Sequence, residues 1–135
     1  MIFWLCIFLI SVGIPVAMIV FGILFIRAAF IGFISSVGYR SRRSRRSSDE
    51  WAFANKMVGR HLIIFGSILL PIYLFIMLLL FTATESVVGL YGGIMILFSI
   101  IPVVLSFLPV ERKLKKNFNF YGQRRKKENV KNLEE

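Results

Sequence analysis

The side chains of this sequence that are suited to chemistry gather in one short polar loop, residues 38–55, which reads GYRSRRSRRSSDEWAFAN. Arginine, serine, one acidic pair and a tryptophan lie there together, between two long apolar runs. Guanidinium groups bind phosphate and carboxylate oxygens, so the loop predicts an anion-binding surface. The run SRRSRRSS is also typical of a nuclear-type basic patch or a phosphorylation site. Because two apolar runs flank the loop closely, contact with lipid headgroups is the simpler interpretation.

The residue sets that enzymes use are missing from the sequence. Its single cysteine, Cys6, lies in an apolar run, its single histidine is His61, and Glu85 stands alone. There is no nucleophile beside a base, no pair of carboxylates placed for acid–base catalysis and no phosphate-binding loop. We therefore expect a protein that is not an enzyme and holds no cofactor or metal. His61 is interpreted as a polar residue at the edge of an apolar run, with a pH sensor as the alternative.

The composition is that of a membrane protein. Of 135 residues, 57% are hydrophobic and only 18% are charged, and the charges are concentrated in residues 38–61 and 111–135. Soluble domains carry about 25% charged residues. The net charge of +10 is also compatible with nucleic acid. Basic residues that flank apolar spans favour anionic lipid headgroups instead, with no direct nucleic-acid contact.

Three apolar runs are long enough to cross a bilayer, whose hydrocarbon core of about 30 Å needs about 20 helical residues. We predict spans at about residues 3–26, 62–81 and 87–110. The fold class is then all-α: one integral membrane domain of three transmembrane helices plus a juxtamembrane loop helix. The first run continues past Arg27, whose charge we place at the headgroups. Residues 28–37 then form a short interfacial or re-entrant piece, or they continue the first helix.

The loop contains a helix start. Ser47 lies three residues before Glu50, the spacing of a capping box, which predicts a helix from Ser47 or Ser48. Four residues of this helix then share one face at spacings of three and four, namely Trp51, Ala54, Asn55 and Val58. Such a helix suits the membrane interface, with Trp51 at headgroup depth. We expect it to lead into the second span.

Glycines crowd the start of the third span. Gly89 and Gly93 are four residues apart, the spacing at which small residues let another helix approach closely. We interpret this pair as a helix-packing face, for a helix of this chain or of a second copy in an oligomer.

The charge distribution predicts the topology. The loop at residues 35–61 and the tail at residues 111–135 are strongly basic, while the first residues and the turn at residues 82–86 carry no lysine or arginine. Basic segments stay on the cytoplasmic side. We therefore place the N-terminus outside, the loop inside, the turn outside and the C-terminal tail in the cytoplasm.

The loop resembles the signature of the SdpI family of small bacterial membrane proteins. In that signature a glycine, tyrosine, arginine and hydroxyl residue are followed by a second hydroxyl, an acidic residue and W-x-F-A-N. The matching residues here are Gly38, Tyr39, Arg40, Ser41, Ser44, Asp49, Trp51, Phe53, Ala54 and Asn55. The tail of the family often reads E-x-x-L-x-x-x-F, which Glu111, Leu114 and Phe118 match. The resemblance covers the loop through the tail.

The resemblance implies a multi-pass protein of the bacterial cell membrane that gives immunity to a secreted peptide toxin. It also implies a receptor that holds a cytoplasmic repressor at the membrane when toxin is bound. Arg40 and Arg43 would then contact lipid phosphate or an acidic surface of the partner, with Trp51 anchoring the loop helix. The alternatives are motif residues that only fix the loop in place, a structural or assembly subunit, and a transporter component.

Overall fold

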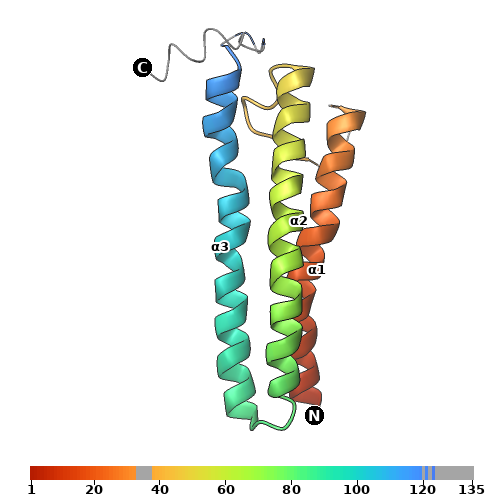
Figure 1. Cartoon of the computed structure of the whole chain (residues 1–135), viewed down its shortest axis with the longest axis vertical. Coiled ribbons are helices and arrows are strands. Elements are labelled where there is room, and N and C mark those ends of the chain that lie inside the picture. Colours follow the sequence, from red (N-terminus) through yellow and green to blue (C-terminus); the bar gives the residue numbers. More distant parts are fainter. Residues whose placement is uncertain (33–37, 120, 122, 124–135) are drawn as a thin grey trace.

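Three long helices make up the computed structural model, which describes residues 1–32, 38–119, 121 and 123. They are α1 (Ile2–Ile31), α2 (Ser48–Leu79) and α3 (Glu85–Asn117), and they run side by side as an elongated bundle (Figure 1). All three are long and apolar enough to cross a membrane. The predicted all-α class with three membrane-spanning helices is confirmed.

The helices extend beyond the apolar spans. α1 continues through Arg27 to Ile31, so the first four residues of the predicted interfacial piece belong to the first helix. The rest of that piece, from residue 33 to residue 37, lies outside the described residues. At the other end of the chain α3 runs on to Asn117, and the first part of the predicted tail is therefore helical. Glu, Arg, Lys and Leu favour helix, which explains why the helix does not stop where the apolar run ends.

The two ends of the bundle differ in charge. The N-terminus and the short link between α2 and α3 lie at one end, while the basic loop and the end of α3 lie at the other (Figure 1). The charge bias of the sequence likewise places the basic loop and the tail on one side of the membrane, and the N-terminus and the link between α2 and α3 on the other. Which end faces the cytoplasm remains a prediction.

Helices α1 and α2 approach each other closely at glycines. A Cβ added to Gly59 would lie 2.5 Å from the carbonyl oxygen of Gly22, and one added to Gly22 would lie 2.8 Å from that of Gly59. Two turns further along α2, a Cβ on Gly66 would lie 2.8 Å from the carbonyl oxygen of Pro15. Only glycine lets the backbones come this near, and small residues serve the same purpose in other membrane helix pairs.

The α3 face that the sequence predicts for packing, at Gly89 and Gly93, is not the face that meets α1 in this chain. Gly93 has nothing within 4 Å of an added Cβ, and Gly89 meets only the ring of Phe3 at 3.4 Å. The close approach is made by Gly92, whose added Cβ would collide with the side chain of Ile7. Buried positions of α3 alternate at spacings of four and three, as in a left-handed coiled coil, over Val88, Gly92, Met95, Ser99, Pro102 and Ser106, and Val110 and Leu114 then follow at spacings of four. Gly93 is one residue further on, about 100° around the helix, and therefore faces away.

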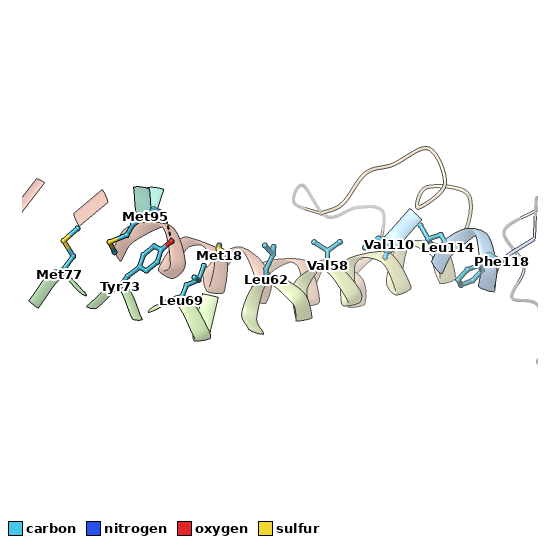
Figure 2. Packing of buried hydrophobic residues seen from close by; sticks show 11 residues of the cluster. Met18, Val58, Leu62, Leu69, Tyr73, Met77, Met95, Val110, Leu114 and Phe118 are labelled. Atoms are coloured by element: carbon cyan, nitrogen blue, oxygen red, sulfur yellow. Dashed lines mark hydrogen bonds between the residues drawn. The ribbon is translucent and has the colours of Figure 1, made fainter. Parts of the chain in front are cut away.

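A row of buried apolar side chains runs along the bundle between the helices (Figure 2). Within this row Tyr73 links α2 to α3, because its hydroxyl donates to the carbonyl oxygen of Met95 at 2.7 Å and lies 2.9 Å from Ser99 Oγ. A hydroxyl inside hydrocarbon needs such a partner. The link therefore sets the register of α2 against α3.

Candidate functional site

The polar loop is folded against the end of the bundle, and its chain enters α2 through a well-formed cap. Ser47 is extended, and its Oγ accepts from the Glu50 N–H at 3.1 Å. The helix start predicted from the Ser47–Glu50 spacing is confirmed, as is its continuation into the second span. Asp49 is exposed in the first turn, where the positive end of the helix dipole favours a carboxylate.

Asn55 holds the start of the loop on α2. Its Oδ1 accepts from the Tyr39 N–H at 2.5 Å, and its Nδ2 donates to the Trp51 carbonyl at 3.0 Å. Gly38 lies so near that an added Cβ would be 2.7 Å from Asn55 Oδ1 and 2.9 Å from the Trp51 ring. The two ends of the family signature, Gly38 with Tyr39 and Trp51 with Asn55, thus contact each other in the fold. Glycine stands at position 38 because any side chain would separate the loop from the helix.

The two motif serines shape the turn that follows. The Ser44 hydroxyl donates to the Tyr39 carbonyl at 2.9 Å, and the Ser44 N–H donates to Ser41 Oγ at 3.0 Å. Ser44 is fully buried. Such side-chain bonds to nearby backbone are what lead serine to favour turns. Both residues therefore have structural partners within the loop.

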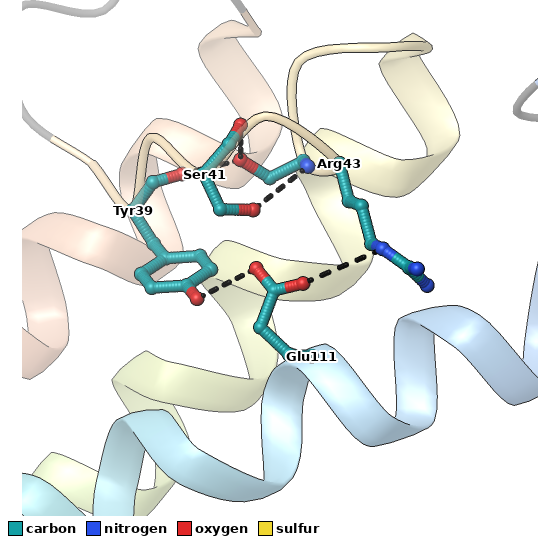
Figure 3. Close-up of polar contacts among 5 residues, drawn as sticks. Tyr39, Ser41, Arg43 and Glu111 are labelled. Carbon is teal, nitrogen blue, oxygen red and sulfur yellow. Dashed lines mark hydrogen bonds and ion pairs between the residues drawn. The ribbon is translucent and has the colours of Figure 1, made fainter.

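Glu111, on α3, joins the loop to the third helix. The Tyr39 hydroxyl donates to Glu111 Oε1 at 2.9 Å, and Arg43 Nε lies 3.8 Å from Glu111 Oε2 (Figure 3). Burial, followed by the hydrogen bond to Glu111 and its negative charge, raises the pKa of Tyr39 from 10.0 to about 12. Tyr39 is therefore a neutral donor at any physiological pH. We call these three residues the latch.

The sequence predicts Trp51 at the membrane interface, but in the structure its side chain is enclosed by the protein itself. Its side chain is 1% exposed, and its Nε1 donates to the Ala28 carbonyl in the last turn of α1 at 2.9 Å. Ala54, Asn55 and Val58 on the same face are also fully buried. This face is covered by the end of α1 and by the loop, so it packs inside the protein instead of against lipid. Trp51 thus anchors the loop helix to α1.

Glu50 was assigned only to the helix start, and its burial was missed. It is 2% exposed, and its Oε2 has no hydrogen-bond partner in the described part of the chain. Burial raises the pKa of Glu50, against the opposing charges of Arg46 and Arg43. It lines a small hollow of about 240 Å³ with Arg43, Arg46 and residues at the end of α3. This burial depends on the docking of α3, for which the sequence carries no local signal.

The remaining motif residues divide between the inside and the surface. Phe53 is half-buried, with its ring 5.7 Å from that of Phe118, the residue that follows α3. Arg40 is exposed, as are Arg42 and Arg45. The structure thus brings most of the signature together in one packed unit and leaves these arginines on its surface. Among the described residues no cluster of His, Cys, Asp and Glu is placed to hold a metal ion.

The fold and this site define a class: a small helical membrane protein with a structured basic loop packed over one end of its bundle. Comparison with known proteins agrees with the motif. The sequence model of the SdpI/YfhL protein family matches residues 35–109, more than half of the chain, and the chain belongs to this family. The match begins just before the loop and ends near the close of the apolar part of α3. No curated protein and no solved structure matches the chain.

Proposed function

We propose that this protein gives a bacterium immunity to a secreted peptide toxin, and that it reports toxin through its basic loop. Family membership supports the proposal, because the match covers the loop together with most of α2 and α3. The chain is then a multi-pass protein of the bacterial cell membrane, with its N-terminus outside and the basic end in the cytoplasm.

The single observation that carries the proposal is the way the loop is attached. Asn55 holds it to α2, and Glu111 holds it to α3. A toxin bound at the opposite end or between the helices that moves α3 against α2 would therefore strain the latch and change how the loop is presented. Toxin must bind the two arrangements with different affinities, because a ligand that binds both equally shifts nothing.

The exposed arginines are the proposed binding surface for the cytoplasmic partner. Arg40, Arg42 and Arg45 are exposed and of one sign. Guanidinium groups pair with carboxylates in two-pronged hydrogen bonds. An acidic surface of a cytoplasmic repressor is the partner that this surface suits, and loop movement would set whether the repressor stays at the membrane.

The test is survival of a toxin-sensitive bacterial strain that produces this protein, challenged with peptides secreted by the source organism and its neighbours. Arg40→Gln is the informative variant, because Arg40 belongs to the signature and is exposed. Arg42→Gln is the matched control, since it removes the same charge from an exposed position outside the signature. Trp51 is unsuitable, because its burial means that its loss disturbs the fold.

We expect the natural chain and Arg42→Gln to protect, and Arg40→Gln to lose protection at an unchanged amount of protein in the membrane. Loss of membrane-inserted protein in Arg40→Gln would show that Arg40 only holds the loop in place. Absence of protection by the natural chain, at good expression, would refute the immunity role. It would favour an assembly subunit or a transporter component instead.

A further inference from the structure

We propose that the groove between α2 and α3, at the basic end of the bundle, binds one anionic phospholipid. This groove has a volume of about 390 Å³, within the range of about 300–1,000 Å³ typical of ligand sites. It is separate from the latch, and none of the signature arginines lines it. The proposal does not depend on the toxin role.

Cations surround the groove. Lys56 and Arg60 of α2 and Lys113 of α3 line it, and among the described residues no carboxylate does. Within the described ranges, neither Arg60 nor Lys113 has a carboxylate within ion-pair distance. Lys56 instead lies over the ring of Phe30, 5.5 Å from its centroid. Positive charges that two helices bring to one groove are suited to a phosphate group.

Apolar side chains line the groove as well. Phe53, Met57 and Ile64 line it together with the cations of α2. From Phe53 to Ile64 the helix rises roughly 16 Å, at about 1.5 Å per residue, with the lining positions on one face. The groove therefore combines a charged and an apolar lining, with the cations of α2 set among apolar residues and Ile64 beyond them on the side of the apolar span. A free anion needs only the charged part, whereas a phospholipid has a phosphate and an acyl chain to fill both.

The groove lies where the apolar spans end. The last charged residue before the apolar stretch of α2 is Arg60, and the first charged residues after that of α3 are Glu111 and Arg112. This is the depth of the phospholipid phosphates. His61 also lines the groove, and its Nδ1 is buried without a hydrogen-bond partner in the described part of the protein. A histidine ring nitrogen can accept a hydrogen bond from a headgroup hydroxyl or, when protonated, donate one to a phosphate oxygen.

Binding is measured on the purified full chain in detergent by native mass spectrometry, titrated with phosphatidylglycerol or phosphatidylcholine. The test variant carries Arg60→Gln and Lys113→Gln. The control carries Arg42→Gln and Arg45→Gln, the same change in charge on the exposed loop. Lys56→Gln, a milder change in the groove, is measured alongside. Unfolding temperatures of all variants in lipid-free detergent show that each is folded.

We expect one tightly bound phosphatidylglycerol and weak binding of phosphatidylcholine. The groove variant should lose about 30-fold in affinity for phosphatidylglycerol, which is about 2 kcal/mol for two cations. Lys56→Gln should lose less, and the control should bind as the natural chain does. Equal losses in groove and control variants, or no loss in the groove variant, would overturn the proposal. Displacement of the lipid by millimolar inorganic phosphate would overturn it too, because the site would then be one for free anions.

Discussion

Replacing Tyr39 by phenylalanine removes one hydroxyl from the latch and leaves the ring packing in place. The Tyr39 hydroxyl donates to Glu111 Oε1 at 2.9 Å. A hydrogen bond to a charged group contributes about 1.5–3 kcal/mol when it is shielded from water. The Glu111 side chain is 41% exposed, so solvent weakens this bond. We therefore expect Tyr39→Phe to lower the free energy of unfolding by about 1 kcal/mol.

The Glu111 carboxylate also faces Arg43, and its contacts with Tyr39 and with Arg43 contribute unequally to stability. Arg43 Nε lies 3.8 Å from Glu111 Oε2, and the two side chains are 35% and 41% exposed. An ion pair of this kind contributes about 0.2–0.5 kcal/mol. Arg43→Gln should thus cost less than Tyr39→Phe, and Glu111→Ala, which removes both contacts, should cost about 1–1.5 kcal/mol.

A double-mutant cycle measures the latch directly. One cycle compares the natural chain, Tyr39→Phe, Glu111→Ala and their double variant, and a second cycle uses Arg43→Gln in place of Tyr39→Phe. The assay is reversible unfolding in mixed detergent micelles. We expect a coupling of about 1 kcal/mol between Tyr39 and Glu111 and about 0.3 kcal/mol between Arg43 and Glu111. Additive effects of Tyr39→Phe and Glu111→Ala would refute the latch, as would a larger coupling for Arg43 than for Tyr39.

Alkaline pH gives the latch a second test. The folded-state pKa of Tyr39 is about 12 and its usual pKa is 10.0, so the folded protein holds the phenolic proton more tightly than the unfolded chain. The resulting stabilisation is fully present below pH 10 and is lost as the pH rises towards 12. The difference in stability between the natural chain and Tyr39→Phe should therefore be constant below pH 10 and shrink above it. An unchanged difference across this range would contradict the raised pKa.

Four further substitutions test the packing between the helices and around the loop. Gly59→Ala should destabilise the folded protein by about 1–3 kcal/mol, because its Cβ would lie 2.5 Å from backbone. Gly93→Ala, whose Cβ would lie in open space, should be neutral or stabilising by up to about 1 kcal/mol. Equal unfolding temperatures of the two variants would contradict the close approach of α1 and α2. Asn55→Ala leaves the Tyr39 N–H without its acceptor and should lower the free energy of unfolding by about 1–3 kcal/mol. Hydrogen exchange of the Tyr39 amide should become faster, while exchange in the apolar spans should not change. Glu50→Gln should raise the unfolding temperature at neutral pH, because burial raises the pKa of the Glu50 carboxyl and its ionised form therefore destabilises the folded protein. The gain should vanish as the pH falls below 4.5 and the carboxyl takes up a proton. A gain that grows in acid would show that the pKa of Glu50 is lowered in the folded protein.

The length of the apolar runs was enough to predict the three helices, and one local spacing was enough to predict how the second begins. Ser47 and Glu50 are three residues apart, and the hydrogen bond between them forms without help from the rest of the chain. Such features are readable because their causes are local. The same holds for the shared face of Trp51, Ala54 and Asn55, which helical spacing alone defines.

What covers a face is not local, and the predictions failed there. Trp51 suits a lipid interface equally well until α1 is seen to end against it. Gly89 and Gly93 have the spacing of a packing pair, but the coiled-coil phase of α3 turns Gly92 inward instead. A readable signal was present on α2, where Gly59 and Gly66 are seven residues apart and therefore on one face.

The signature residues have consequences for how this family is tested. Gly38, Asn55, Ser44 and Trp51 contact one another or the backbone within the protein, so each is explained by the folding of the loop. A substitution at any of them removes the loop conformation together with whatever the loop does. Loss of activity there says nothing about a partner, whereas loss at exposed Arg40 with the protein still inserted does. Experiments on function in this family should therefore begin at the surface arginines and keep the buried signature residues intact.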